Sequence, residues 1–153
     1  MESILYNLCL TLHIVGFTLF AGITFADFMA FRRFWKVWDE DPARALLTRE
    51  ITSAFPPVMR FSGIALVLAG VSMLLLVRGV FSEQLWFRIK MVLVFCLIVN
   101  GIFAGRLQRL QLKKLLEGKP GTPALLRARI RLFHVLQLAL IGGIFLLTAF
   151  RFN

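Results

Sequence analysis

Four long runs of apolar residues constrain this chain more than any other feature of its sequence. They cover about residues 4–31, 61–77, 86–105 and 132–150. Their lengths are close to the roughly 20 residues that an α-helix needs to cross a bilayer. A spanning segment must satisfy its backbone hydrogen bonds internally, and runs of this length favour helices over barrel strands. The sequence therefore predicts an all-α integral membrane protein, a single four-span domain folded as an antiparallel four-helix bundle.

The overall composition agrees with a membrane environment. Of the 153 residues, 59% are hydrophobic and only 17% are charged, and the mean hydropathy is +0.80. A soluble domain of this length would be less apolar and more charged. The sequence MESILYN at residues 1–7 has no basic residue, and no small-residue cleavage site follows. We therefore expect a retained first span and not a cleaved signal peptide.

The net charge of +10 has an uneven distribution along the chain. Most of the Lys and Arg residues fall within two loops, at residues 32–60 and 106–131. These residues are Arg32, Arg33, Lys36, Arg44, Arg49, Arg60, Arg106, Arg109, Lys113, Lys114, Lys119, Arg127, Arg129 and Arg131. Both loops lie on one side of a four-span chain, as basic cytoplasmic loops do. We expect both termini outside, anionic lipid head groups as partners and no nucleic-acid partner.

Helix-start signals occur in both basic loops. Asp41 followed by Pro42 predicts a helix that Asp41 caps, covering about residues 43–55. Pro56 and Pro57 are expected to break the chain before the second span.

The second basic loop has a similar signal. Thr122 precedes Pro123, which predicts a further helix start after a turn at residues 118–122. The helices on both sides of this turn are expected to continue beyond the lipid.

The first run contains an imidazole, His13, in an otherwise apolar segment. Helical spacing places it on one stripe with Cys9, Gly16, Phe20, Ile23 and Asp27. Because ionisable groups avoid lipid, this stripe should face the interior of the bundle. At 1.5 Å per residue, His13 lies about 15 Å below the outer end of its helix.

Lys90 is a charge placed just inside the third run. It is about 6 Å deeper than Trp86, and its helical face carries Leu93, Leu97, Asn100 and Ala104. A charge at this depth either snorkels to the surface or has a functional role, and the sequence leaves both readings open. In the second case Lys90 and His13 would reach one ligand in the outer half of the membrane.

The second and fourth runs contain small and polar residues. Gly63 and Gly70 would let another helix, or a flat ligand, approach the backbone closely, and helix packing is the favoured reading. His134 and Gln137 share one face of the fourth run. His134 lies about 25 Å from the outer end, which differs from the depth of His13 by about 10 Å. We therefore expect a packed His134 that bonds to Gln137, and we keep it as the weaker candidate iron ligand.

Three motifs support a family resemblance: LHIVG…AG in the first run, WFRIK at the start of the third and GRL at its end. They resemble the bacterial haem-b membrane protein family of oxygen-independent protoporphyrinogen oxidases (the HemJ type). They are also similar to the copper-resistance-D-like membrane proteins. The first resemblance implies His13 as the axial ligand of haem b, a functional Lys90 and a Trp at position 86. Asn100 stands where a further histidine is expected.

The same resemblance implies an oxidoreductase in the bacterial inner membrane. It would pass electrons from a porphyrinogen to the quinone pool or a similar acceptor. A haem needs an imidazole, small residues for close approach and a cation near its propionates. His13 and Gly16 meet the first two needs, and Arg78, Arg88 or Lys90 the third. The alternative hypothesis is a cofactor-free membrane scaffold or partner subunit, whose small residues serve helix packing or association of two copies of the chain.

Overall fold

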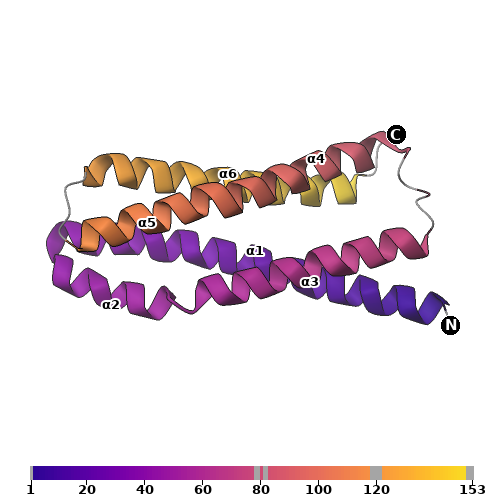
Figure 1. The fold of residues 1–153 in the computed structure, drawn as a ribbon, viewed down its shortest axis with the longest axis horizontal. Helices are drawn as coiled ribbons and strands as arrows, with labels where there is room; N and C mark the ends of the chain where they lie inside the picture. The colour runs from indigo at the N-terminus through magenta and orange to yellow at the C-terminus, as the bar shows by residue number, and fades with distance from the viewer. Residues whose placement is uncertain (1, 78–79, 81–82, 118–121, 151–153) are drawn as a thin grey trace. The chain divides into compact units, whose positions relative to one another are not determined.

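The structure is a computed structural model that describes residues 2–77, 80, 83–117 and 122–150. These residues form six α-helices and one π-helix, and no strand occurs among them (Figure 1). The elements are α1 (Glu2–Glu40), α2 (Pro42–Thr52), α3 (Phe55–Leu76), α4 (Leu85–Val99), the π-helix η1 (Asn100–Ala104), α5 (Gly105–Leu116) and α6 (Pro123–Ala149). The predicted all-α helical-bundle class is confirmed.

Four helical stretches have the length and apolar composition of membrane spans. They are Ser3–Glu40, Phe55–Leu76, Leu85–Leu116 and Pro123–Ala149. Only 6% of the most apolar window is buried in the third stretch, and 28% in the fourth. Large apolar side chains therefore cover the outside of the helices, with Phe61 74% and Leu75 72% exposed. Exposing such an apolar surface to water is unfavourable, and lipid covers it without this cost. The chain is a multi-pass membrane protein.

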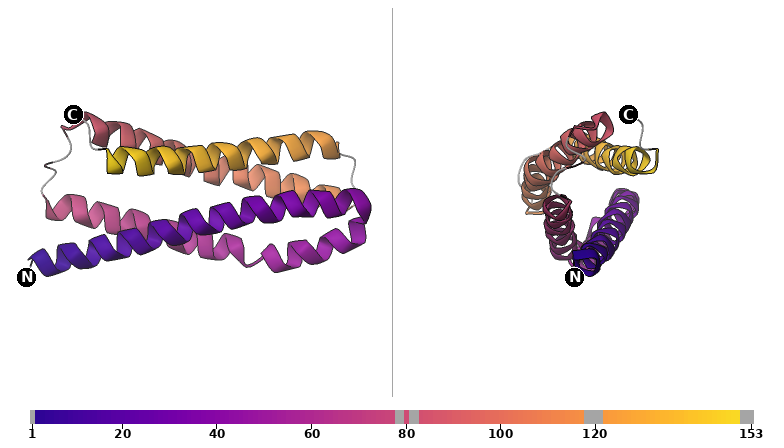
Figure 2. Two further views of the ribbon diagram at one scale, coloured as in Figure 1. Left: turned by 180° about the vertical axis from the view of Figure 1, so that it is seen from behind. Right: turned by 90° about the vertical axis from the view of Figure 1, so that its right-hand side faces the viewer.

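The chain divides into two compact units, residues 1–82 and 83–153. The first unit contains α1, α2 and α3, and the second contains α4, η1, α5 and α6. In each unit two long helical stretches run antiparallel and pack along their length (Figures 1 and 2). Each unit is thus a helical hairpin.

Helix α1 is much longer than the predicted first span. With 39 residues it measures about 58 Å at 1.5 Å per residue, against a hydrocarbon core of about 30 Å. The stretch 32–40, expected to begin a loop, continues the helix as far as Glu40. Nothing in the sequence of this stretch interrupts a helix. A helix that leaves the lipid keeps its backbone hydrogen bonds, so it can continue into water.

The end of α1 is determined by the predicted capping signal. The Oδ1 atom of Asp41 accepts hydrogen bonds from the backbone N–H groups of Ala43 and Arg44, at 2.9 and 3.2 Å. Pro42 occupies the first turn of α2, where its missing N–H costs nothing. This helix start is confirmed. Phe34 and Trp35 at the end of α1 and Ala45 of α2 are buried, and α2 packs back against α1.

Pro56 and Pro57 act differently from the prediction. They were expected to break the chain before the second span, but they lie within the first turn of α3, which begins at Phe55. Proline is tolerated there because the first N–H groups of a helix have no intrahelical partner. The short helix α2 ends at Thr52, three residues before the predicted limit.

In the second unit α4, η1 and α5 form one uninterrupted helical stretch that runs past the predicted end of the third span at residue 105. It packs antiparallel to α6, which begins at Pro123 after Thr122, so this predicted start is also confirmed. The Thr122 side chain makes no capping hydrogen bond. The expected turn at 118–122 lies outside the described residues, apart from Thr122.

Candidate functional site

The imidazole ring of His13 in α1 forms a hydrogen bond to the neighbouring helix α3. Its Nδ1 atom lies 3.0 Å from the backbone carbonyl oxygen of Leu66 in α3. A carbonyl oxygen only accepts hydrogen bonds, so Nδ1 must be the nitrogen that carries the proton. In a neutral imidazole the lone pair is then on Nε2. His13 is a half-buried side chain with a fixed tautomer.

Gly70 allows His13 to approach α3 closely. A Cβ atom at position 70 would lie 3.1 Å from His13 Cε1 and 3.3 Å from Nδ1, both shorter than ordinary contacts. Gly70 follows Leu66 by one helical turn, so it lies beside the carbonyl that His13 binds. Any side chain at position 70 would crowd the imidazole, which would have to shift by a few tenths of an ångström.

The rest of the α1 stripe also packs on α3. Gly16 is buried, and a Cβ there would lie 3.3 Å from the backbone nitrogen of Leu66. One turn further, the ring of Phe20 lies over Gly63, at 3.5 Å from a Cβ built on that glycine. His13, Gly16 and Phe20 thus meet α3 in antiparallel register. The close approach expected at Gly16 is present, and the group that approaches this glycine is the backbone of α3.

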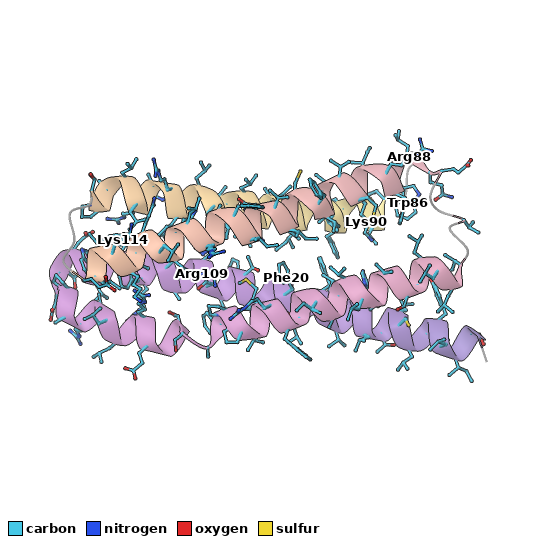
Figure 3. All side chains as sticks on the ribbon, viewed as in Figure 1. Phe20, Trp86, Arg88, Lys90, Arg109 and Lys114 are labelled. Atoms are coloured by element: carbon cyan, nitrogen blue, oxygen red, sulfur yellow. The ribbon has the colours of Figure 1, made fainter. Side chains whose placement is uncertain are left out.

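Lys90 lies on the face of α4 that is directed toward α6. On that face Leu93 lies 3.4 Å from a Cβ built on Gly143, and Leu97 is buried. Continuing this antiparallel register by one turn places Lys90, which is half-buried, near the level of Leu147. Arg88 is exposed on the opposite side of α4 (Figure 3).

Trp86 is not an exposed member of an interfacial aromatic belt. It is only 6% exposed, and its Nε1 donates a hydrogen bond of 2.6 Å to Oε1 of Gln84. Its ring packs edge-on against Phe87. Trp86 therefore anchors the start of α4. Arg78, the other cation considered for a propionate, lies outside the described residues.

Asn100 has a structural role that its position in the sequence does not reveal. Its Nδ2 donates a hydrogen bond of 2.7 Å to Oε1 of Gln137 in α6, and Gln137 is only 3% exposed. Asn100 is also the first residue of η1, where the backbone N–H of Gly105 reaches back five residues to the Asn100 carbonyl. Single turns of π-helix often occur at functional sites. The sequence predicted a hydrogen bond between His134 and Gln137. In the structure Gln137 bonds to Asn100 instead.

His134 is buried in α6, with 4% of its surface exposed. Its Nδ1 lies 2.8 Å from the carbonyl oxygen of Ile130, one turn earlier in the same helix. The same argument as for His13 places its proton on Nδ1 and its lone pair on Nε2. Its ring also packs edge-on against Phe133. The packed environment expected for this residue is present.

The predicted site residues belong to both units. His13 and Gly16 lie in the first unit, and Trp86, Arg88, Lys90, Asn100 and His134 lie in the second. The pairing of His13 with Lys90 stays a prediction. Among the described residues, no three His, Cys, Asp or Glu side chains gather as a metal-binding group. A haem needs only one or two protein ligands, so this finding does not bear on haem binding, and His13 as an iron ligand also stays a prediction.

The comparisons with known proteins do not assign a family. No protein-family model matches the chain, and neither the curated proteins nor the solved structures contain a significant match to it. The functional argument therefore depends on the residues themselves.

Proposed function

We propose that the chain is a haem-b-binding redox protein of the membrane, with Nε2 of His13 as the axial ligand of the iron. The observation that carries this proposal is the 3.0 Å hydrogen bond between His13 Nδ1 and the Leu66 carbonyl oxygen. Histidines that bind metals usually donate their other ring N–H in this way, which fixes the tautomer and makes the ligating nitrogen more basic. When bound, haem b supplies one-electron chemistry.

Lys90 is the residue proposed to handle protons. In the activity that the family resemblance implies, hydrogens leave a porphyrinogen as protons and electrons in equal number, and a quinone-type acceptor takes up both. A deprotonated Lys90 amine would accept one of these protons. The basic loops favour an orientation with both termini outside, and the resemblance implies the bacterial inner membrane.

The absorption spectrum of the purified protein tests this proposal. The full chain would be expressed with added haem precursor, extracted in mild detergent and examined in the visible range. We expect a Soret band that is lost in His13→Ala and retained in the matched control His134→Ala. Size-exclusion chromatography would confirm that both variants remain folded. A wild-type protein without a Soret band, even after haem is added, would overturn the proposal.

The packing of α1 on α3 favours one second candidate, a cofactor-free scaffold or partner subunit. Gly16 and Gly70 both face the other helix, as small residues do in membrane helix pairs. In this candidate His13 is only a hydrogen-bond donor that joins α1 to α3. His13→Gln, which keeps a donor, would then preserve the melting temperature and any cellular phenotype. A haem ligand could not be replaced in this way, because the Soret band would disappear.

A further inference from the structure

The second unit contains a basic hollow that the haem proposal does not use. It has a volume of about 220 Å³ and lies where the end of α5 meets the start of α6. Lys114 and Gln111 line it from α5, and Arg129 and Thr122 line it from the α6 side. Leu115 and Leu126 form its apolar part. Lys114 is labelled on α5 in Figure 3.

The charged residues among the described lining of the hollow are all basic. Lys114 and Arg129 approach it from two helices, and none of the described lining residues is acidic. The nearby ion pair, at 3.8 Å, joins Lys113 to Glu117, and neither of these two residues lines the hollow. An anion in the hollow would therefore meet two cations and no carboxylate among the described lining residues.

Local backbone geometry adds to this preference. Helix α6 begins at Pro123, which has no N–H, and the Thr122 side chain does not cap the N–H groups that follow. The first turn of a helix of 27 residues thus leaves donors without an intrahelical partner, at the positive end of its dipole. Phosphate groups bind readily at such helix starts. Gln108 holds the two helices together here, since its Nε2 donates to the Arg129 carbonyl oxygen at 3.4 Å.

The chemistry of the lining favours a phosphate that carries an acyl chain. The polar side chains of Gln111 and Thr122 lie next to leucines, and Leu125, which also lines the hollow, is 52% exposed. Basic pockets between membrane helices at the positively charged face bind the head groups of anionic lipids. We propose that this hollow binds the phosphate of an anionic phospholipid through Lys114, Arg129 and the start of α6.

Lipid-dependent stabilisation of the full-length protein tests this inference. Melting temperatures would be measured in detergent while short-chain phosphatidylglycerol is added, with short-chain phosphatidylcholine and inorganic phosphate as parallel titrations. We expect phosphatidylglycerol to raise the melting temperature more than the other two probes. Each cation near a membrane surface contributes about 1 kcal/mol to the binding of anionic lipid. The double variant Lys114→Gln/Arg129→Gln should therefore bind phosphatidylglycerol about thirtyfold more weakly.

A matched control separates the hollow from general attraction by charge. Lys113→Gln/Arg131→Gln removes the same charge from the same two helices, outside the lining. It should keep the wild-type affinity. An equal loss in both double variants would overturn the site, and inorganic phosphate as effective as phosphatidylglycerol would overturn its assignment to a lipid. These results do not depend on haem, so they test the hollow independently of the redox proposal.

Discussion

The two helical hairpins of this protein differ in how closely their helices approach and in the groups that form the hydrogen bond between them, an imidazole and a backbone carbonyl in the first and two amide side chains in the second. In the first, Gly16 and Gly70 let α1 and α3 approach so closely that an added Cβ would be crowded. In the second, the α4–η1 stretch is joined to α6 by the hydrogen bond between Asn100 and Gln137. Packing of small residues and polar hydrogen bonds are the two main ways to join helices in lipid, where apolar burial gives little. The comparison predicts that the first hairpin is sensitive to side-chain size and the second to side-chain polarity.

The largest effect is expected from a bulky residue at position 16. In Gly16→Leu the side chain would meet the backbone of Leu66, which cannot rotate away as a side chain does. Overpacking of this kind costs about 1–3 kcal/mol, and backbone contact favours the upper part of that range. Thermal unfolding in detergent would measure the loss. Gly22→Leu is the control on the same helix, because nothing lies within 4 Å of a Cβ at Gly22.

Gly70→Ala should have a smaller effect on stability and a specific effect on His13. The added methyl group would lie 3.1 Å from His13 Cε1, so the imidazole must shift by a few tenths of an ångström, which should strain its hydrogen bond to the Leu66 carbonyl. We expect a loss of about 1 kcal/mol, the typical net value of one hydrogen bond. In a haem-loaded protein the Soret band should also shift or weaken. Gly63→Ala is the matched control in α3, because its Cβ meets Phe20 at an ordinary 3.5 Å. Equal losses in both variants would contradict the special role of Gly70.

The hydrogen bond of the second hairpin can be measured by a double-mutant cycle. Asn100→Leu and Gln137→Leu each remove one partner and leave the other amide in an apolar environment. Hydrogen bonds between membrane helices average about 0.6 kcal/mol and reach about 1.7 kcal/mol. We expect a coupling energy in this range, with the double variant more stable than the sum of the single losses indicates. Additive losses would show that the amide pair does not join the helices.

The sequence predicted the parts of this fold that depend on composition and on local signals. The apolar runs gave four long helices, and Asp41 with Pro42 gave the start of α2. The continuation of α1 to Glu40 could not be predicted from the apolar run, because the run shows where the lipid ends and not where the helix ends. A helix that leaves the lipid keeps its internal hydrogen bonds, so basic residues after a span do not end it.

The contacts between helices were harder to predict than the helices. The sequence marks Gly70 as a site of close approach, but no residue pattern connects it with His13. Likewise the helical period placed Gln137 beside His134, and its partner Asn100 came from another helix. The π-helix η1 was also not predicted, because no residue pattern in 100–104 distinguishes it from an α-helix. Periodicity identifies the faces of a helix, and only tertiary structure decides which faces meet.

The smallest predicted effect, no change at all, is expected for Thr122→Ala, in a comparison of the caps at the starts of α2 and α6. Asp41 accepts two backbone hydrogen bonds, whereas Thr122 makes no capping bond. Asp41→Ala should therefore cost about 1 kcal/mol, and Asp41→Asn, which keeps an acceptor, should cost less. Thr122→Ala should leave the melting temperature unchanged, although Thr122 and Pro123 carry the same start signal as Asp41 and Pro42. A Thr122→Ala variant as destabilised as Asp41→Ala would contradict this prediction, because it would show that the Thr122 hydroxyl caps α6. The hydroxyl would then compete with a phosphate for the same backbone N–H groups.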